Sequence, residues 1–117
     1  MKIFKLPKLA DADGSFCLGK RELGTEAVYM LYTRLRHGEE PKKISPAAGA
    51  EEIIFVIKGN IRVKCAKTDF FVGPGEAFHS KEAASFHIEN IGSDDAIFIS
   101  AGGRGGTETS HRRACGL

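Results

Sequence analysis

Glu52 is the carboxylate of this sequence that is best placed to do chemistry. Successive side chains of a strand point to opposite faces, so Glu52 shares its face with Ile54 and Val56. If that face lines the interior, Glu52 is a general base or a hydrogen-bond acceptor for a bound molecule. The alternatives are an ion pair with Arg34 or Arg36 on a neighbouring strand and solvation at the strand end.

His79 is the histidine that we expect to work with Glu52, because an imidazole exchanges protons near neutral pH. The alternative for His79 is a half-buried strand residue bonded to a backbone carbonyl. Strand alternation places Phe86 and Ile88 on one face and His87 on the other. We therefore expect His87 at the surface or at an interface.

Short strands are the elements that would position these side chains. The apolar run from Ile53 to Ile57 does not alternate, which predicts a strand covered on both faces, and the Gly59-Asn60 pair after it is a hairpin signal. A loop is expected at 42–50. Strands are expected at 2–6, 15–18, 27–36, 52–58, 61–66, 70–72, 77–80, 84–91 and 96–101. Their close spacing, without a sustained helical period, indicates an all-β barrel or sandwich.

The composition of the chain limits its class. At 117 residues it is expected to form one domain, and its net charge of +2 is too small to indicate a nucleic-acid partner. Cys17, Cys65 and Cys115 are widely spaced, which favours neither a disulfide framework nor a zinc knuckle. No apolar run approaches the length of a membrane span and no signal peptide is evident, so a cytoplasmic protein without membrane contact is expected.

The C-terminal part of the chain is rich in glycine and then polar. The stretch Gly102-Gly103-Arg104-Gly105-Gly106 resembles an RNA-binding element, but a flexible segment is the preferred interpretation. Residues 107–117 are basic and are expected to form a flexible tail. The predicted domain therefore covers 1–106, with its core at 28–101.

Two sequence motifs resemble those of the cupin superfamily. The spacing of Glu52 and Gly59 is similar to the first cupin motif, in which the glutamate binds a metal. Gly75 and Asn90 fit the ends of the second motif, but Phe86 stands where that motif has a metal-binding histidine. The resemblance implies a single-domain jelly-roll β-barrel in which Asn90 organises a strand end.

The nitrogen ligands of the cupin metal site are replaced in this sequence. Pro46 and Ala48 stand where the first motif has two histidines, so the matching positions supply one carboxylate. A first-row metal needs about three or four ligands, and we therefore expect no cofactor and no conventional metal site. A divalent metal held by an unusual set that includes His37, His79 or His87 is the disfavoured alternative.

A small-molecule-binding module is the preferred function. An apolar cavity with Glu52 as its polar contact is expected to be lined by Ile54, Val56, Phe86 and Ile88. One alternative is a metal-independent isomerase or epimerase of a sugar or keto compound that uses Glu52 and His79, and another is a divergent dioxygenase-like metalloenzyme. A homodimer is also expected, because either a partner subunit or the segment 2–6 must cover the second face of the apolar strand.

Overall fold

The computed structural model describes residues 1–45, 49–66, 68–81 and 85–104. Its elements are α1 (Leu6–Leu9), β1 (Ser15–Leu18), α2 (Lys20–Leu23), β2 (Tyr29–Leu35), β3 (Lys42–Ile44), β4 (Ala50–Lys58), β5 (Ile61–Lys64), β6 (Asp69–Val72), β7 (Ala77–Ser80), β8 (Phe86–Asn90) and β9 (Ala96–Arg104).

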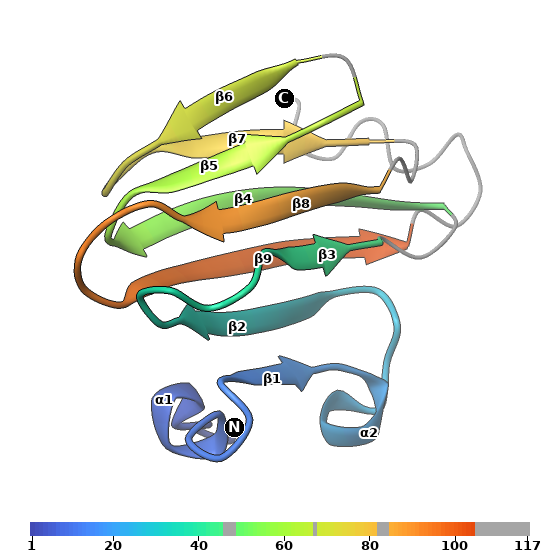
Figure 1. Cartoon of the computed structure of the whole chain (residues 1–117). Coiled ribbons are helices and arrows are strands. Elements are labelled where there is room, and N and C mark those ends of the chain that lie inside the picture. The colour runs from blue at the N-terminus through green and yellow to red at the C-terminus, as the bar shows by residue number, and fades with distance from the viewer. Residues whose placement is uncertain (46–48, 67, 82–84, 105–117) are drawn as a thin grey trace.

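The strands form two antiparallel sheets that lie one over the other (Figure 1). The five-stranded sheet has the order β1-β2-β9-β4-β7, and the four-stranded sheet has the order β3-β8-β5-β6. The all-β prediction is therefore confirmed. The strand pairings of the described residues stay within each sheet and do not close a barrel.

The hydrophobic core lies between the two sheets. In β4 the alternate residues Ala50, Glu52, Ile54 and Val56 are buried, as the shared-face prediction required. The core cluster takes side chains from both sheets: Leu35, Ile44, Ile54, Val56, Ile61, Val63, Val72, Phe86, Ile88, Ala96 and Phe98. Burying each larger apolar side chain is worth ~1.5–3 kcal/mol, so this layer holds the sheets together.

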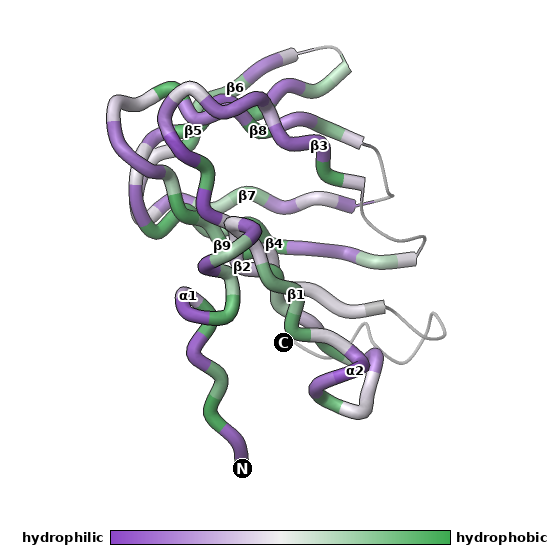
Figure 2. The backbone as a smooth tube through the Cα atoms, turned by 60° about the horizontal axis from the view of Figure 1, so that its bottom comes forward, coloured by the Kyte–Doolittle hydropathy of each residue, from purple (hydrophilic) through white to green (hydrophobic). Residues whose placement is uncertain are grey.

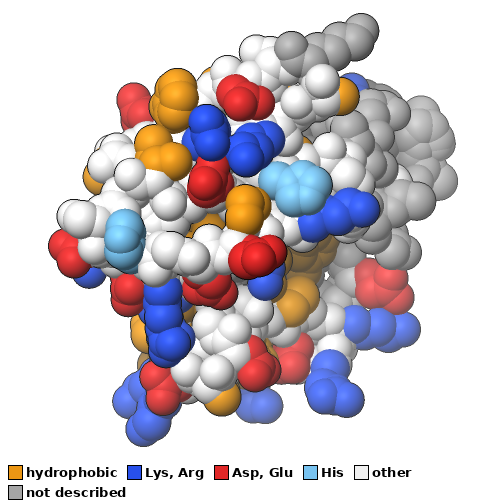
Figure 3. Space-filling view, in the orientation of Figure 1, with side chains coloured by type: hydrophobic (Ala, Val, Ile, Leu, Met, Phe, Trp, Pro, Cys, Tyr) orange, Lys and Arg blue, Asp and Glu red, His pale blue; other side chains and the backbone are white. Residues whose placement is uncertain are grey.

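The prediction that both faces of β4 are covered is wrong for the single chain. Ile53, Phe55 and Ile57 are 56%, 43% and 47% exposed on the outer face of the five-stranded sheet. Strand geometry alternates the side chains whatever their polarity, and the second sheet covers only one face. The outer face of the four-stranded sheet is more polar. Figure 3 shows acidic, basic and histidine side chains mixed over the face that this sheet presents to the viewer.

The N-terminal segment is not the strand that was predicted at 2–6. Residues 1–5 carry no regular structure and run away from the sheets as an arm, and α1 begins at Leu6 (Figure 2). Pro7 occupies the first turn of α1, where its missing N–H costs no hydrogen bond. Both described helices have four residues, too few to give a periodic sequence signal or to cross a membrane.

Two further segments differ from their predictions. β3 lies inside the expected loop at 42–50, where three residues are too few to show alternation. Gly102 and Gly103 belong to β9 and are not flexible, because they pair with β4. Gly105, Gly106 and the expected tail at 107–117 lie outside the described residues. The other eight predicted strands are present within a few residues of their expected bounds.

Candidate functional site

A pocket of about 390 Å³ opens beside Glu52 at one end of the molecule. Its walls come from β1, β2 and the loop before β2 on one side and from β3 on the other. Glu52 and Tyr29 give it polar groups, and Val28, Leu31 and Ile44 give it apolar surface. The pocket therefore reaches from solvent into the inner face of the five-stranded sheet.

Tyr29 and Glu52 meet above a glycine. They lie on β2 and β4, which are separated by β9, and both are in register with Gly102 of that strand. The Tyr29 hydroxyl donates a hydrogen bond to Glu52 Oε2. A Cβ at Gly102 would lie 3.0 Å from Glu52 Cγ and 3.1 Å from the Tyr29 oxygen. The bare backbone of Gly102 is what gives the two side chains room to meet.

The second oxygen of Glu52 has no hydrogen-bond partner among the residues that the structure describes. Glu52 is 6% exposed, and its Oε1 is buried without a hydrogen bond. The Ser100 and Thr33 hydroxyls are buried on the same inner face, and they too have no partner. Buried polar atoms are almost always hydrogen-bonded in folded proteins. Glu52 Oε1 is therefore an acceptor that is available to a molecule in the pocket.

Lys42 and Cys17 are two of the other polar or ionisable residues that line the pocket. Lys42 lies opposite Ile88 on β3, which places it on the inward side of that strand, where it is half-buried. Partial burial, with the nearby carboxylates of Glu22 and Glu52, raises the pKa of the Cys17 thiol. Cys17 is therefore protonated at neutral pH, which disfavours it as a nucleophile.

The structure does not bring His79 to Glu52. The β4–β7 register aligns His79 with Ile53, so His79 lies on the outer face while Glu52 points inward. His79 Nε2 lies 2.8 Å from Glu51 Oε1, and both side chains are exposed. This corrects the predicted Glu52–His79 pair. Sequence parity within one strand did not fix how β7 pairs with β4.

The ion-pair alternative for Glu52 is also absent from the structure. Arg34 Nη1 lies 4.0 Å from Asp11 Oδ1 on the outer side of β2, and the carboxylate of Glu52 contacts Tyr29 instead. Glu51 is exposed and Glu52 is buried, as predicted. His87 is exposed, which confirms its predicted outward direction.

The four residues predicted to line the cavity are packed in the core. Ile54, Val56 and Ile88 are fully buried, and the Phe86 ring packs edge-to-face on Phe78 at 5.8 Å between centroids. None of the four lines the pocket at Glu52. The correction follows from the tight packing between the sheets, which leaves the open space at the end of the sandwich.

Asn90 organises a strand end, as the resemblance implied. Its amide nitrogen donates to the carbonyl oxygens of Leu35 and Asp94 at 2.9 and 2.8 Å, and its oxygen accepts from the Gly92 N–H. Asn90 therefore ties the end of β8 to the end of β2 and to the loop that leads into β9.

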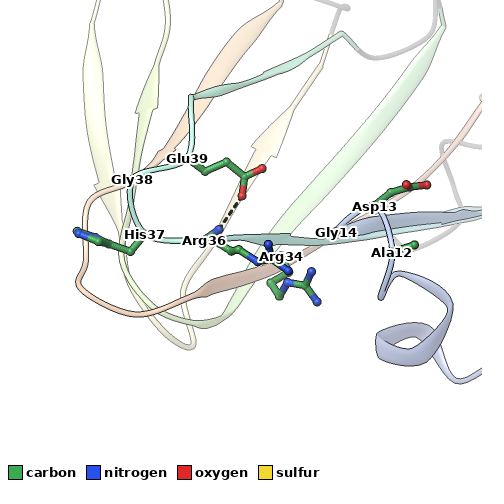
Figure 4. Close-up of a pocket in the computed structure, with 8 residues that line it drawn as sticks. All are labelled: Ala12, Asp13, Gly14, Arg34, Arg36, His37, Gly38 and Glu39. Carbon is green, nitrogen blue, oxygen red and sulfur yellow. Dashed lines mark hydrogen bonds between the residues drawn. The ribbon is translucent and has the colours of Figure 1, made fainter.

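A second pocket of about 310 Å³ lies at the opposite end of β2 (Figure 4). Arg34 and Arg36 lie close together there, whereas the His37 ring points away from them and its Nδ1 is 2.8 Å from Gly92 O. The Arg36 N–H donates to Glu39 Oε1 at 2.8 Å. Asp13 and Glu39 offset the two guanidinium charges, so this pocket shows no clear preference for an anion.

Comparison with solved structures identifies the fold. A cupin family protein with a double-stranded β-helix fold from Methanocaldococcus jannaschii aligns with a TM-score of 0.69 at 19% identity, over 89% of this chain and 91% of that one. The chain has the cupin fold. Neither the protein-family models nor the curated protein sequences contain a match to it.

Two other cupin structures are similar at comparable levels. The cupin domain of an XRE family transcriptional regulator from Enterobacter cloacae aligns with a TM-score of 0.65 at 17% identity, over 80% of this chain and 100% of that domain. The Cnp3 cupin domain of Schizosaccharomyces pombe gives 0.64 at 18% identity over 78% of this chain, which spans 60% of that structure. These likenesses concern the fold.

The described residues do not fit the metal of the cupin motifs. Glu52 is hydrogen-bonded to Tyr29, and the histidine position is filled by the buried ring of Phe86. Positions 46–48 lie outside the described residues. Among the residues that the structure describes, no three His, Cys, Asp or Glu side chains are grouped so as to hold a metal ion.

Sequence reasoning missed most of the pocket. No motif in the sequence distinguished Tyr29 from Tyr32, the other tyrosine of the same strand. Cys17 and Lys42 gave no usable signal, because β1 and β3 are short strands that reach the site through pairing with β2 and β8. The glycines of β9 were the clue that could have been used, since glycine inside a strand often marks a close approach.

Proposed function

We propose that this cupin-fold chain binds a small polar molecule in the pocket at Glu52, without a conventional metal site. The observation that supports the proposal is Glu52 Oε1, a buried carboxylate oxygen at the edge of an accessible pocket that has no hydrogen-bond partner in the described part of the chain. Tyr29 holds the other oxygen and so fixes the direction of the carboxylate. A preoriented acceptor of this kind selects a ligand that carries a donor.

The surroundings of Glu52 narrow the ligand further. Val28, Leu31 and Ile44 provide apolar wall, which suits the carbon skeleton of a small metabolite. A hydroxyl, amide or amine of that molecule would donate to Glu52 Oε1. Lys42 would face the outer part of the ligand, where an acidic or carbonyl oxygen is favoured.

Replacement of one carboxylate tests the proposal. Glu52→Gln keeps the shape and removes the charge, and we expect it to weaken ligand binding about tenfold or more, because hydrogen bonds to a charged group are worth ~1.5–3 kcal/mol. Glu51→Gln is the matched control, since Glu51 is exposed on the opposite face. Native mass spectrometry of the purified chain, followed by thermal-shift screening of polyols, sugars, amides and amines, would supply the ligand.

The proposal fails if Glu52→Gln and Glu51→Gln bind the ligand equally well. It also fails if no member of the panel raises the melting temperature and nothing co-purifies with the chain.

A metal-independent isomerase or epimerase is a second candidate. The hydrogen-bonded Tyr29–Glu52 pair favours it, because a carboxylate base and a phenol donor share one pocket. In this candidate Tyr29 takes the part that the sequence assigned to His79. Loss of turnover in Tyr29→Phe, with ligand binding retained, would support catalysis, whereas an equal loss of binding would favour a binding module.

A further inference from the structure

The pocket at the far end of β2 from Glu52 has walls that are fixed by hydrogen bonds. One wall is the loop after α1, which is held to β2 because the Arg34 N–H donates to Gly14 O at 2.7 Å. The other wall is the turn after β2. The Arg36 N–H donates to Glu39 Oε1 at 2.8 Å, and the Glu39 N–H donates to Arg36 O at 3.1 Å. The backbone itself therefore keeps open the space of about 310 Å³ between the two walls.

The two arginines of this pocket have unused hydrogen-bond donors. Only 17% of the Arg34 side chain is exposed, and its Nε is buried without a hydrogen-bond partner among the described residues. Its ion pair with Asp11 is long, at 4.0 Å from Nη1. The Arg36 side chain is exposed, and the described part of the chain offers its guanidinium no ion pair. Two guanidinium groups that lie close together repel each other, and a carboxylate bound to both relieves that repulsion.

The acidic residues of the pocket are separate from its arginines. Asp13 and Glu39 line the same space, but neither forms an ion pair with Arg34 or Arg36. Figure 4 shows both carboxylates apart from the two guanidinium groups. The formal charges of these four side chains cancel, which disfavours a simple anion, but the positive and negative groups occupy different places in one pocket. A ligand that carries both charges can therefore pair with both kinds of group.

We propose that this pocket binds a small amino acid as its zwitterion. The ligand carboxylate accepts hydrogen bonds from the guanidinium groups of Arg34 and Arg36, and its ammonium group donates to Asp13 and Glu39. Glu39 keeps Oε2 for this contact, because its Oε1 accepts the Arg36 N–H. The site is distinct from the pocket at Glu52 and does not depend on what that pocket binds.

Titrations of the full chain at neutral pH, followed by its backbone amide signals in NMR spectra, test the site. The probes are glycine, 3-aminopropanoate and 4-aminobutanoate, whose two charges lie progressively farther apart. Each is compared with the carboxylate that lacks its amino group: acetate, propanoate or butanoate.

We expect the Gly14 and Gly38 signals to shift, because both residues line the pocket. At least one amino acid should bind about threefold or more tightly than its matched carboxylate, since a second charge pair adds affinity even where water screens it. The Gly102 signal reports on the pocket at Glu52, with which it is in register, and should stay unchanged. Equal binding of every amino acid and its carboxylate, or no shift at Gly14 and Gly38 in the tens of millimolar, would overturn the proposal.

Two substitutions separate the two halves of the site. Arg36→Gln should weaken the amino acid and its matched carboxylate alike, by about threefold or more. Asp13→Asn should instead reduce the advantage of the amino acid over the carboxylate, because Asp13 contacts the ammonium group. Arg21→Gln and Glu40→Gln are the matched controls, since both residues are exposed and lie outside the pocket. Unchanged binding in Arg36→Gln, or an advantage that survives in full in Asp13→Asn, would contradict the assigned contacts, and the same spectra verify that each variant is folded.

Discussion

Gly102 is the residue on which the geometry of the site depends most. We expect Gly102→Ala to destabilise the fold by about 1–3 kcal/mol, the usual cost of overpacking, because the new methyl group would overlap the Glu51 carbonyl oxygen and crowd Tyr29. Gly92→Ala is the control, since its Cβ would meet Asn90 Oδ1 at an ordinary 3.5 Å. Urea unfolding of the two variants gives the comparison. Equal stability of the two would contradict the close packing of Tyr29, Gly102 and Glu52.

At the scale of single elements, the β5–β8 pairing carries a pH-dependent ion pair. Arg62 and Glu89 are cross-strand neighbours, and the Arg62 guanidinium nitrogens lie 2.6 and 3.1 Å from Glu89 Oε1. The hydrogen bond from Arg62 lowers the pKa of Glu89 below 4.5, while desolvation opposes it and the Lys64 charge assists it. The pair therefore stabilises the fold above about pH 4.5 and loses this effect as the pH falls through the lowered pKa of Glu89.

The measurement is the melting temperature as a function of pH. The melting temperature of the wild type should be higher than that of Arg62→Gln at neutral pH. This difference should shrink at pH values below the pKa of Glu89. Lys58→Gln is the control, because Lys58 has no ion pair among the described residues, and its difference from wild type should not depend on pH in this range. A difference between wild type and Arg62→Gln that stayed constant into acid would contradict this assignment. Salt should reduce the effect at neutral pH, since both side chains are partly exposed.

Local patterns predicted the strands of this chain well because each strand is encoded by its own residues and by the turns around it. The inward direction of Glu52 followed from its parity with Ile54 and Val56. The error at His79 concerned the pairing between strands, because the register between β4 and β7 depends on both strands and on the residues that connect them. The strand predicted at 2–6 was wrong because apolar residues alone do not form a strand without a partner strand to supply hydrogen bonds.

For the whole molecule, the replaced ligand positions lead to a prediction about metal content. We expect the purified chain to carry far less than one equivalent of zinc, iron, manganese or nickel, because Phe86 puts an apolar ring at a ligand position. Elemental analysis after purification without chelators would measure this. A near-stoichiometric metal would contradict the prediction, and loss of that metal in His37→Ala or His79→Ala would then identify the alternative ligands.

What could not be predicted for the whole molecule is the relation between its two sheets. The apolar run in β4 indicated burial on both faces, but in the folded chain the four-stranded sheet covers only one face of β4. Nor does sequence spacing show that the open space lies at the end of the sandwich and not in its middle. Both features arise from contacts between residues that are far apart in the chain.

The central place of β9 has a consequence for synthesis on the ribosome. β9 is the neighbour of both β2 and β4, yet among the described strands it is the last to be made. Until it emerges, the nascent chain holds two apolar strands whose shared hydrogen-bonding partner does not yet exist. The β5–β6 hairpin can form early because its contacts are local, but the larger sheet must wait. A pause or truncation before residue 96 would therefore leave the apolar strands β2 and β4 without their shared partner, and we expect that fragment to aggregate or to bind chaperones.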